Sequence, residues 1–150
     1  MALPTTRSFA GVILYVETAP GSGVYVQRMC GFSQKALDLT AQTSTGLVPD
    51  CNNPEGASWD VSGVSSKGGK ITLSGVYAEE DEPFWNTWFD NTTAYGIRWV
   101  KAAVGFRAGP GLLTALGEST ELRQDANLLK RSITIENAGA WPWTAGDPPA

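Results

Sequence analysis

The stretch Gly68–Thr92, GGKITLSGVYAEEDEPFWNTWFDNT, contains two hydrophobic periodicities in succession. In its first part Ile71 and Leu73 alternate with small polar residues, which is typical of a β-strand with one buried face. In its second part the period changes to that of a helix. This is the one helix that we predict in the chain, and one helix is too few for alternating βαβ units.

The predicted helix is short, amphipathic and covers about residues 82–90. Acidic residues at 79–82 place negative charge at its N-terminus, and Pro83 suits the first turn because its missing N–H has no partner there. The aromatic residues that follow fall on one stripe, which we expect to pack against the rest of the domain. This stripe consists of Phe84, Trp85, Trp88 and Phe89.

The rest of the chain predicts short strands separated by turns. β-type runs occur at residues 23–32, 35–42, 94–104, 112–123 and 128–139. The Pro-rich tail from residue 140 is not expected to continue a strand. We therefore predict a mainly β fold, a two-sheet sandwich or barrel flanked by one helix. We expect a single domain over residues 1–150 with an arm at each terminus.

The segment 43–59 lacks any period and is rich in Gly, Pro, Asn and Ser, so we predict a long loop there. Loops longer than about 12–15 residues are usually functional or disordered. The only two cysteines, Cys30 and Cys51, flank part of this region. Without histidine or a CxxC pair they cannot supply the four ligands of a structural zinc site. Two free thiols and a disulfide formed later in an oxidising exterior both remain open.

Composition limits the function. The chain has 150 residues, a net charge of −4 and no histidine. The acidic excess argues against nucleic acid or an anionic membrane as a direct partner. No imidazole base and no phosphate-loop motif is present, so we expect no catalysis, no metal and no cofactor. The apolar run near the N-terminus is short for a signal peptide, so we expect synthesis in the cytoplasm.

Three of the six tryptophans, Trp59, Trp141 and Trp143, fall outside the predicted helix and strands. Tryptophan is enriched where one protein buries against another. The alternatives are that these side chains fold back on their own domain, or that they form a platform for stacking sugars.

The run from Cys30 to Val76, followed by EEDEPFWNTWF, resembles the major tail tube protein of long-tailed bacteriophages. The shared features are a CGF strand, a long loop with VPDC, a tryptophan, a Gly/Ser-rich strand and a short helix. The resemblance covers about residues 30–100. The strand ITLSGV departs from the family in carrying one glycine where two are common.

The resemblance implies two packed sheets and six copies per ring, with rings stacked into a hollow tube for DNA. It implies that the long loop and both terminal arms contact the neighbouring ring. With the apolar residues of the loop, this gives as inter-ring candidates Thr43, Leu47, Val48, Pro49, Asp50 and Trp59. The arm candidates are Trp141 and Trp143.

Acidic residues that alternate with apolar ones on predicted strands are candidates for the lumen, where they would repel phosphates. They are Asp38, Glu118, Glu121 and Glu136. The alternative is that they simply solvate an outer sheet. The implied partners are further copies of the chain, together with tail tip, tape-measure and terminator proteins in a virion tail. DNA would pass through without specific binding.

Two other functions compete with a phage tail tube. A carbohydrate-binding β-sandwich would explain the aromatic content. A tube protein of a contractile tail or secretion system would share the rings but also need a sheath.

Overall fold

The computed structural model describes residues 11–28, 31–49, 51–53, 55–76, 79–122 and 127–149, without the side chains of 120–122 and 127–128. The predictions for Cys30 and Asp50, and for the side chain of Glu121, therefore lie outside the described residues. Among the helices in these ranges, none has the length and apolarity needed to cross a membrane.

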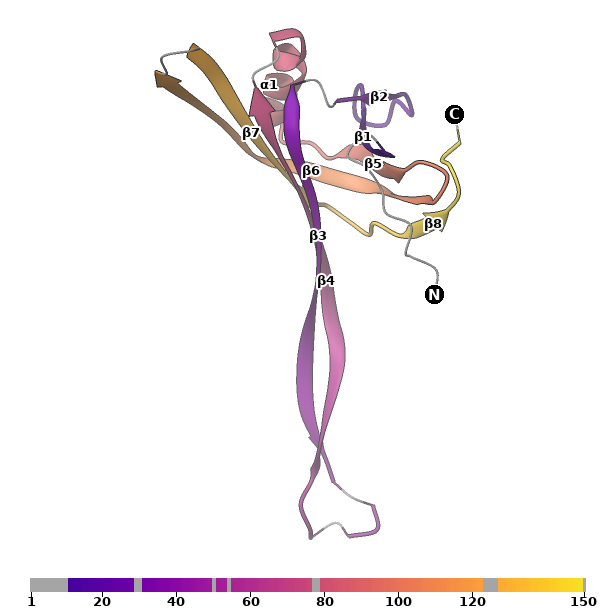
Figure 1. Cartoon of the computed structure of the whole chain (residues 1–150). Helices are drawn as coiled ribbons and strands as arrows, with labels where there is room; N and C mark the ends of the chain where they lie inside the picture. Colours follow the sequence, from indigo (N-terminus) through magenta and orange to yellow (C-terminus); the bar gives the residue numbers. More distant parts are fainter. Residues whose placement is uncertain are drawn as a thin grey trace, which may run out of the picture.

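Within these ranges the chain forms eight strands, a short 3-10 turn (η2) and one helix (Figure 1). The helix α1 spans Glu82–Asn91, which confirms the predicted helix. The turn η2, Glu79–Asp81, precedes it directly. The strands are β1 Val12–Glu17, β2 Tyr25–Gln27, β3 Phe32–Val48, β4 Trp59–Val76, β5 Tyr95–Lys101, β6 Gly105–Leu122, β7 Asn127–Asn137 and β8 Trp143–Ala145.

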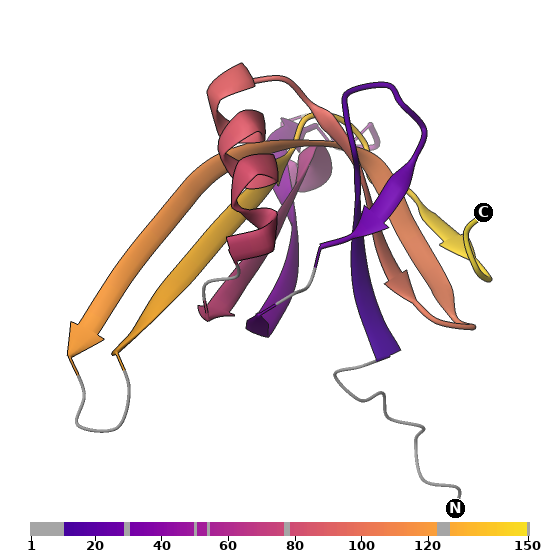
Figure 2. The same ribbon diagram turned by 90° about the horizontal axis from the view of Figure 1, so that it is seen from above.

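The strands pair in one antiparallel sheet with the order β2-β1-β5-β6-β7-β4-β3, and β8 also pairs with β6. The long strand β6 belongs to two parts of the sheet. Its residues 105–111 pair with β5, and its residues 111–122 pair with β7. The ladder shifts register between Leu113 and Ala115, and the sheet bends along β6 (Figure 2). The predicted mainly β, sandwich-like fold with one helix is confirmed, with β6 continuous between its two parts.

The core lies between the two parts of the sheet and under α1. Ile71 and Leu73 are fully buried, as their alternation predicted. They pack in one cluster with residues of β1, β5 and β7. From the helix, Trp85 and Trp88 enter this cluster with only 1% of their surface exposed. The Trp88 ring stacks on Tyr95, with centroids 4.8 Å apart.

The prediction for Phe89 is wrong, because this side chain remains 44% exposed. At about 100° per residue, Phe84 and Phe89 lie at opposite rims of the stripe centred on the two buried tryptophans. Phe84 is covered by the Arg28 guanidinium, 4.0 Å from its ring centroid, and by Tyr95. No described residue covers Phe89 in the same way, so the stripe is wider than the face that the domain buries.

The predicted loop 43–59 is also corrected. Residues 43–48 continue β3, and β4 begins at Trp59, so the connection spans only residues 49–58. The two strands pair from Phe32 and Gly75 out to Val48 and Trp59. Figure 1 shows this hairpin projecting far from the body. Both of its faces are exposed, so the sequence there has no reason to alternate and carries no strand period.

Outside the β3–β4 hairpin, three further strand segments were missed. The run VILYVE of β1 has little polar alternation because the strand is largely covered. The first part of β6 contains Pro110 and several glycines, which disfavour a strand in sequence-based prediction. The tail forms β8, which contradicts the expectation that no strand continues there; its ladder with β6 has only three residue pairs.

Candidate assembly surfaces

The part of the sheet formed by β3, β4, β7 and the second part of β6 has one face turned away from the core. Side chains on this face are mostly small and uncharged. In register, Ala36, Thr72 and Thr134 form one row across three strands. Gln34, Ser74 and Ser132 form the next row, with the Ser74 hydroxyl donating to Gln34 Oε1 at 3.1 Å. We call this surface the polar sheet face.

Charges on the polar sheet face balance among the described residues. Asp38, Lys70 and Glu136 are direct register partners on three adjacent strands, so the lysine lies between two carboxylates. Lys130 lies three rows further along β7 on the same face. The structure thus brings together two of the predicted lumen acids, Asp38 and Glu136, and adds lysines that the prediction did not consider. Lys70 could have been found from the sequence, because it belongs to the same strand alternation as Ile71.

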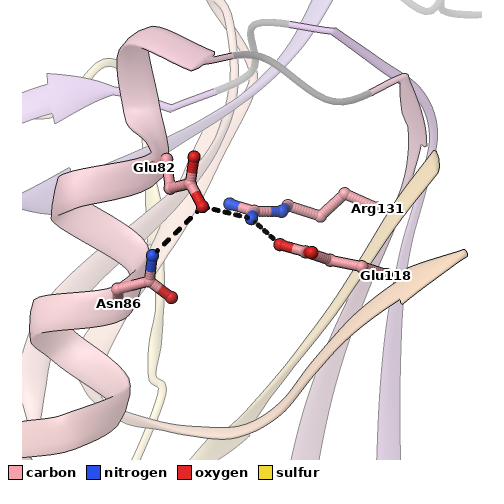
Figure 3. A network of polar contacts seen from close by, with 4 residues as sticks. All are labelled: Glu82, Asn86, Glu118 and Arg131. Atoms are coloured by element: carbon pink, nitrogen blue, oxygen red, sulfur yellow. Dashed lines mark hydrogen bonds and ion pairs between the residues drawn. The ribbon is translucent and has the colours of Figure 1, made fainter. Parts of the chain in front are cut away.

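Glu118 lies on the opposite side of the same sheet, facing the helix (Figure 3). Its carboxylate pairs with the guanidinium of Arg131 on β7, whose side chain is 2% exposed. The same guanidinium nitrogen lies 3.9 Å from Glu82 Oε1 at the start of α1. Asn86 donates to that carboxylate at 3.5 Å. Glu118 therefore helps to hold the helix on the sheet and does not share the face of Asp38 and Glu136.

The acidic run before the helix has a second attachment to the body. Arg28 donates to Asp81 Oδ1 at 3.1 Å while its guanidinium covers Phe84. On the far side of the fold, the Lys35 ammonium donates to the carbonyl of Val12, and burial lowers the pKa of this lysine below its usual value of 10.5. These charged groups join elements of the domain to one another. In the part of the chain that the structure describes, no group of three acidic or cysteine side chains could hold a metal ion.

The outer end of the β3–β4 hairpin, residues 43–64, carries exposed apolar side chains far from the core; we call it the hairpin tip. Trp59 and Leu47 are each 71% exposed. Val48 pairs with Trp59, and Gly46 pairs with Val61. The side chains of Val48, Trp59 and Val61 therefore share one face of the hairpin. Exposed apolar groups that gather on a projecting element indicate a partner.

Of the remaining loop predictions, Thr43 pairs with Val64 inside the hairpin, and Pro49 is exposed just after β3. Val61 and Val64 were missed, although both are exposed on the same element. Cys51 is an exposed free thiol in the connection at the end of the tip.

Trp141 does not have the role predicted for it. It is 7% exposed and belongs to the core of its own domain. Its ring lies against Gly69, where a Cβ would overlap it, and its indole N–H donates to the carbonyl of Pro110 at 2.7 Å. The alternative of packing on its own domain therefore applies. Trp143 on β8 stays half-exposed, with Lys101 and Arg107 each 5.9 Å from its ring centroid.

The part of the sheet that carries the polar sheet face has two strand edges without a partner in the described chain. β3 is the last strand in the sheet order, so its outer edge is open. β6 pairs with β5 only as far as Gly111, so its later residues have β7 on one side alone. Open edges of this kind are templates for pairing with another chain.

No family model and no curated protein sequence matches this chain. Solved structures do match. A chain from the tail of an empty gene transfer agent particle, refined with C6 symmetry, has a TM-score of 0.71 at 16% identity, covering 93% of this chain and 100% of that one. A chain of the SPP1 tail tube has a TM-score of 0.62 at 8% identity, covering 95% of this chain and 80% of that one.

A chain from the baseplate of the anti-feeding prophage also matches, with a TM-score of 0.62 at 10% identity, covering 96% of this chain and 97% of that one. The protein thus has the fold of tail and tail-tube subunits. The resemblance to tail tube proteins of long-tailed phages is confirmed at the level of the fold.

Proposed function

We propose that this chain is the structural, non-enzymatic subunit of a bacteriophage tail tube, forming stacked hexameric rings whose lumen conducts DNA. The observation that carries the proposal is the shared fold over 93% of this chain and the whole of the gene transfer agent tail chain. The C6 symmetry of that assembly is the reason for proposing six copies per ring.

The open edges supply a route to ring closure. If the free edge of β3 pairs with the free edge of β6 in the next copy, each subunit contributes four strands to a continuous barrel. Six copies make about 24 strands, and a spacing of about 4.8 Å gives a circumference of about 115 Å. The backbone diameter is then about 37 Å before strand tilt widens it, which leaves room for a duplex once side chains are added.

The polar sheet face suits the inside of such a barrel. Most of its side chains are small and uncharged, and Lys70 has a carboxylate on each side. Phosphate contacts from lysine and arginine dominate DNA affinity, and flanking acids weaken them. The lining would let DNA pass by balancing its charges, and Asp38 and Glu136 are the acids that we assign to it.

Stacking of rings is assigned to the hairpin tip, with Leu47, Val48 and Trp59 as anchors. Further partners would be the tail tip, tape-measure and terminator proteins of the virion, with synthesis in the host cytoplasm. A tube of a contractile tail is the second candidate, favoured by the match to the anti-feeding prophage baseplate chain. That function would add a sheath around the same rings.

The test is negative-stain electron microscopy of the purified chain after concentration, together with sedimentation velocity. We expect hollow tubes or rings with six-fold averages. A monomer at every concentration, combined with a clear hit on a glycan array, would replace the tube with the carbohydrate-binding alternative.

A further inference from the structure

A groove of about 540 Å³ lies where the projecting hairpin leaves the body. One wall is formed by residues 39–41 of β3 and 67–69 of β4, and the other by residues 139–143. Gly68 and Gly69 line it without side chains, so the groove stays open beside the buried Trp141 ring.

The groove combines apolar surface with positive charge. Leu39 and Trp143 both line it and are both substantially exposed. Lys67 and Arg107 are its charged lining residues, and none of the acidic residues that the structure describes contributes to it. Arg107 also donates to the carbonyl of Trp141 at 2.9 Å, which holds its guanidinium beside the groove. An occupant with apolar side chains and carboxylates would complement this lining.

The hairpin tip has the opposite chemistry. Residues 43–64 contain three acidic residues and no lysine or arginine. Two of them, Glu55 and Asp60, are described and exposed, and Asp60 pairs with the exposed Leu47 on the face of the hairpin opposite to Trp59. The tip therefore presents apolar side chains beside negative charge, which is what the groove lacks.

A chain cannot place its tip in its own groove. Both lie on the same paired strands, and the antiparallel pairing continues from the groove to Trp59 with one register shift between Gln42 and Thr43. At about 3.4 Å per residue, Trp59 lies about 27 Å from Lys67 along β4. A second copy displaced by about that distance along the hairpin would bring its tip to the groove. Such a head-to-tail contact does not close and repeats along an axis.

We propose that this groove receives the hairpin tip of a second copy of the chain, with Trp59 against its apolar wall and the tip carboxylates near Lys67 and Arg107. The inference rests on the proposed tail-tube function and names the receiving site for ring stacking. It also sets the axial repeat of the tube at roughly the distance from groove to tip, about 30 Å.

The experiment uses Cys51 of the tip as a reporter. The variant Ala140→Cys places a thiol in the exposed wall of the groove. After assembly and mild oxidation, we expect a ladder of covalent oligomers on a non-reducing gel. The control Ala140→Cys with Cys51→Ser should give no ladder, and neither should Thr87→Cys, which places the new thiol on the exposed side of α1.

A charge reversal provides an independent measurement if the added thiol disturbs folding. Lys67→Glu should raise the concentration needed for tube growth at least tenfold, and adding Asp60→Lys should restore growth. The matched control Lys67→Arg keeps the positive charge at this position and should assemble normally. If tubes form without the covalent ladder and Lys67→Glu does not affect their growth, the groove is not the receiving site, and the proposed function still stands. If the unaltered chain forms no polymer at all, the proposed function is wrong.

Discussion

Two regions of this protein both carry large apolar side chains and have opposite surroundings. In α1, Trp85 and Trp88 are buried in a cluster that joins the helix to both parts of the sheet. In the hairpin tip, Trp59 and its neighbours are among the most exposed apolar residues that the structure describes. The first region stabilises the monomer, whereas the second contributes almost nothing to it. Apolar content alone therefore does not tell a core from an interface, because the surroundings decide between them.

Trp88→Ala is expected to have the largest effect on the stability of the monomer. The substitution removes a buried ring that stacks on Tyr95 and an indole N–H that donates to Thr93 at 3.0 Å. We expect the free energy of unfolding to fall by about 3–5 kcal/mol. Chemical denaturation followed by tryptophan fluorescence and circular dichroism measures it. A loss below about 1 kcal/mol would mean that the helix does not depend on this contact.

Glu118→Gln tests the polar attachment of the same helix. It leaves the buried Arg131 guanidinium without its closest carboxylate, so we expect a loss of about 2 kcal/mol. The matched control is Glu82→Gln, whose carboxylate lies further from the guanidinium, at 3.9 Å, with an expected loss below about 1 kcal/mol. Equal losses in the two variants would contradict the geometry of Figure 3.

Shortening the hairpin tests the other region. Replacing residues 44–63 by Asn-Gly joins the paired residues Thr43 and Val64 through a tight turn. None of the deleted residues belongs to the core, so we expect a change in unfolding free energy below about 1 kcal/mol. Electron microscopy should find no stacked tubes. Normal tube growth would show that the tip is not the stacking element.

Trp59→Ala should have the smallest effect on the monomer, below about 0.5 kcal/mol, because the side chain is mostly in solvent. The concentration at which tubes form should nevertheless rise at least tenfold, as measured by light scattering. Val104→Ala removes a comparably exposed apolar group from the body and serves as the control. A similar rise in both variants would make the effect a general one of surface hydrophobicity.

Much of the fold could be predicted where one face of an element is buried. Apolar residues fall on one side of the strand around Ile71 and Leu73 and on one side of α1, because each element buries one face. Both elements were located correctly. The outer hairpin has no buried face, so residues 43–48 were mistaken for loop. The run of β1 is covered on much of both faces and was missed for the opposite reason.

The candidate surfaces were predicted less completely. Trp59 and Leu47 could be named from their place among polar residues, and the structure exposes both. Trp141 could not be told from them, because the glycines that make room for its ring, Gly69 and Gly109, lie in other parts of the sequence. Glu118 and Glu136 looked alike as acids on strands, but a register shift in β6 and the buried Arg131 separate them.

The class of fold, the position of the helix and the acidic, histidine-free composition can all be read from the amino-acid order, since they depend on local periodicity and residue counts. The projecting β3–β4 hairpin, the two open strand edges of the described chain and the distance of about 27 Å from groove to tip follow from the three-dimensional structure alone. These features arise from pairing between residues far apart in the chain. Local sequence patterns carry no record of such pairing when neither face of a strand is buried.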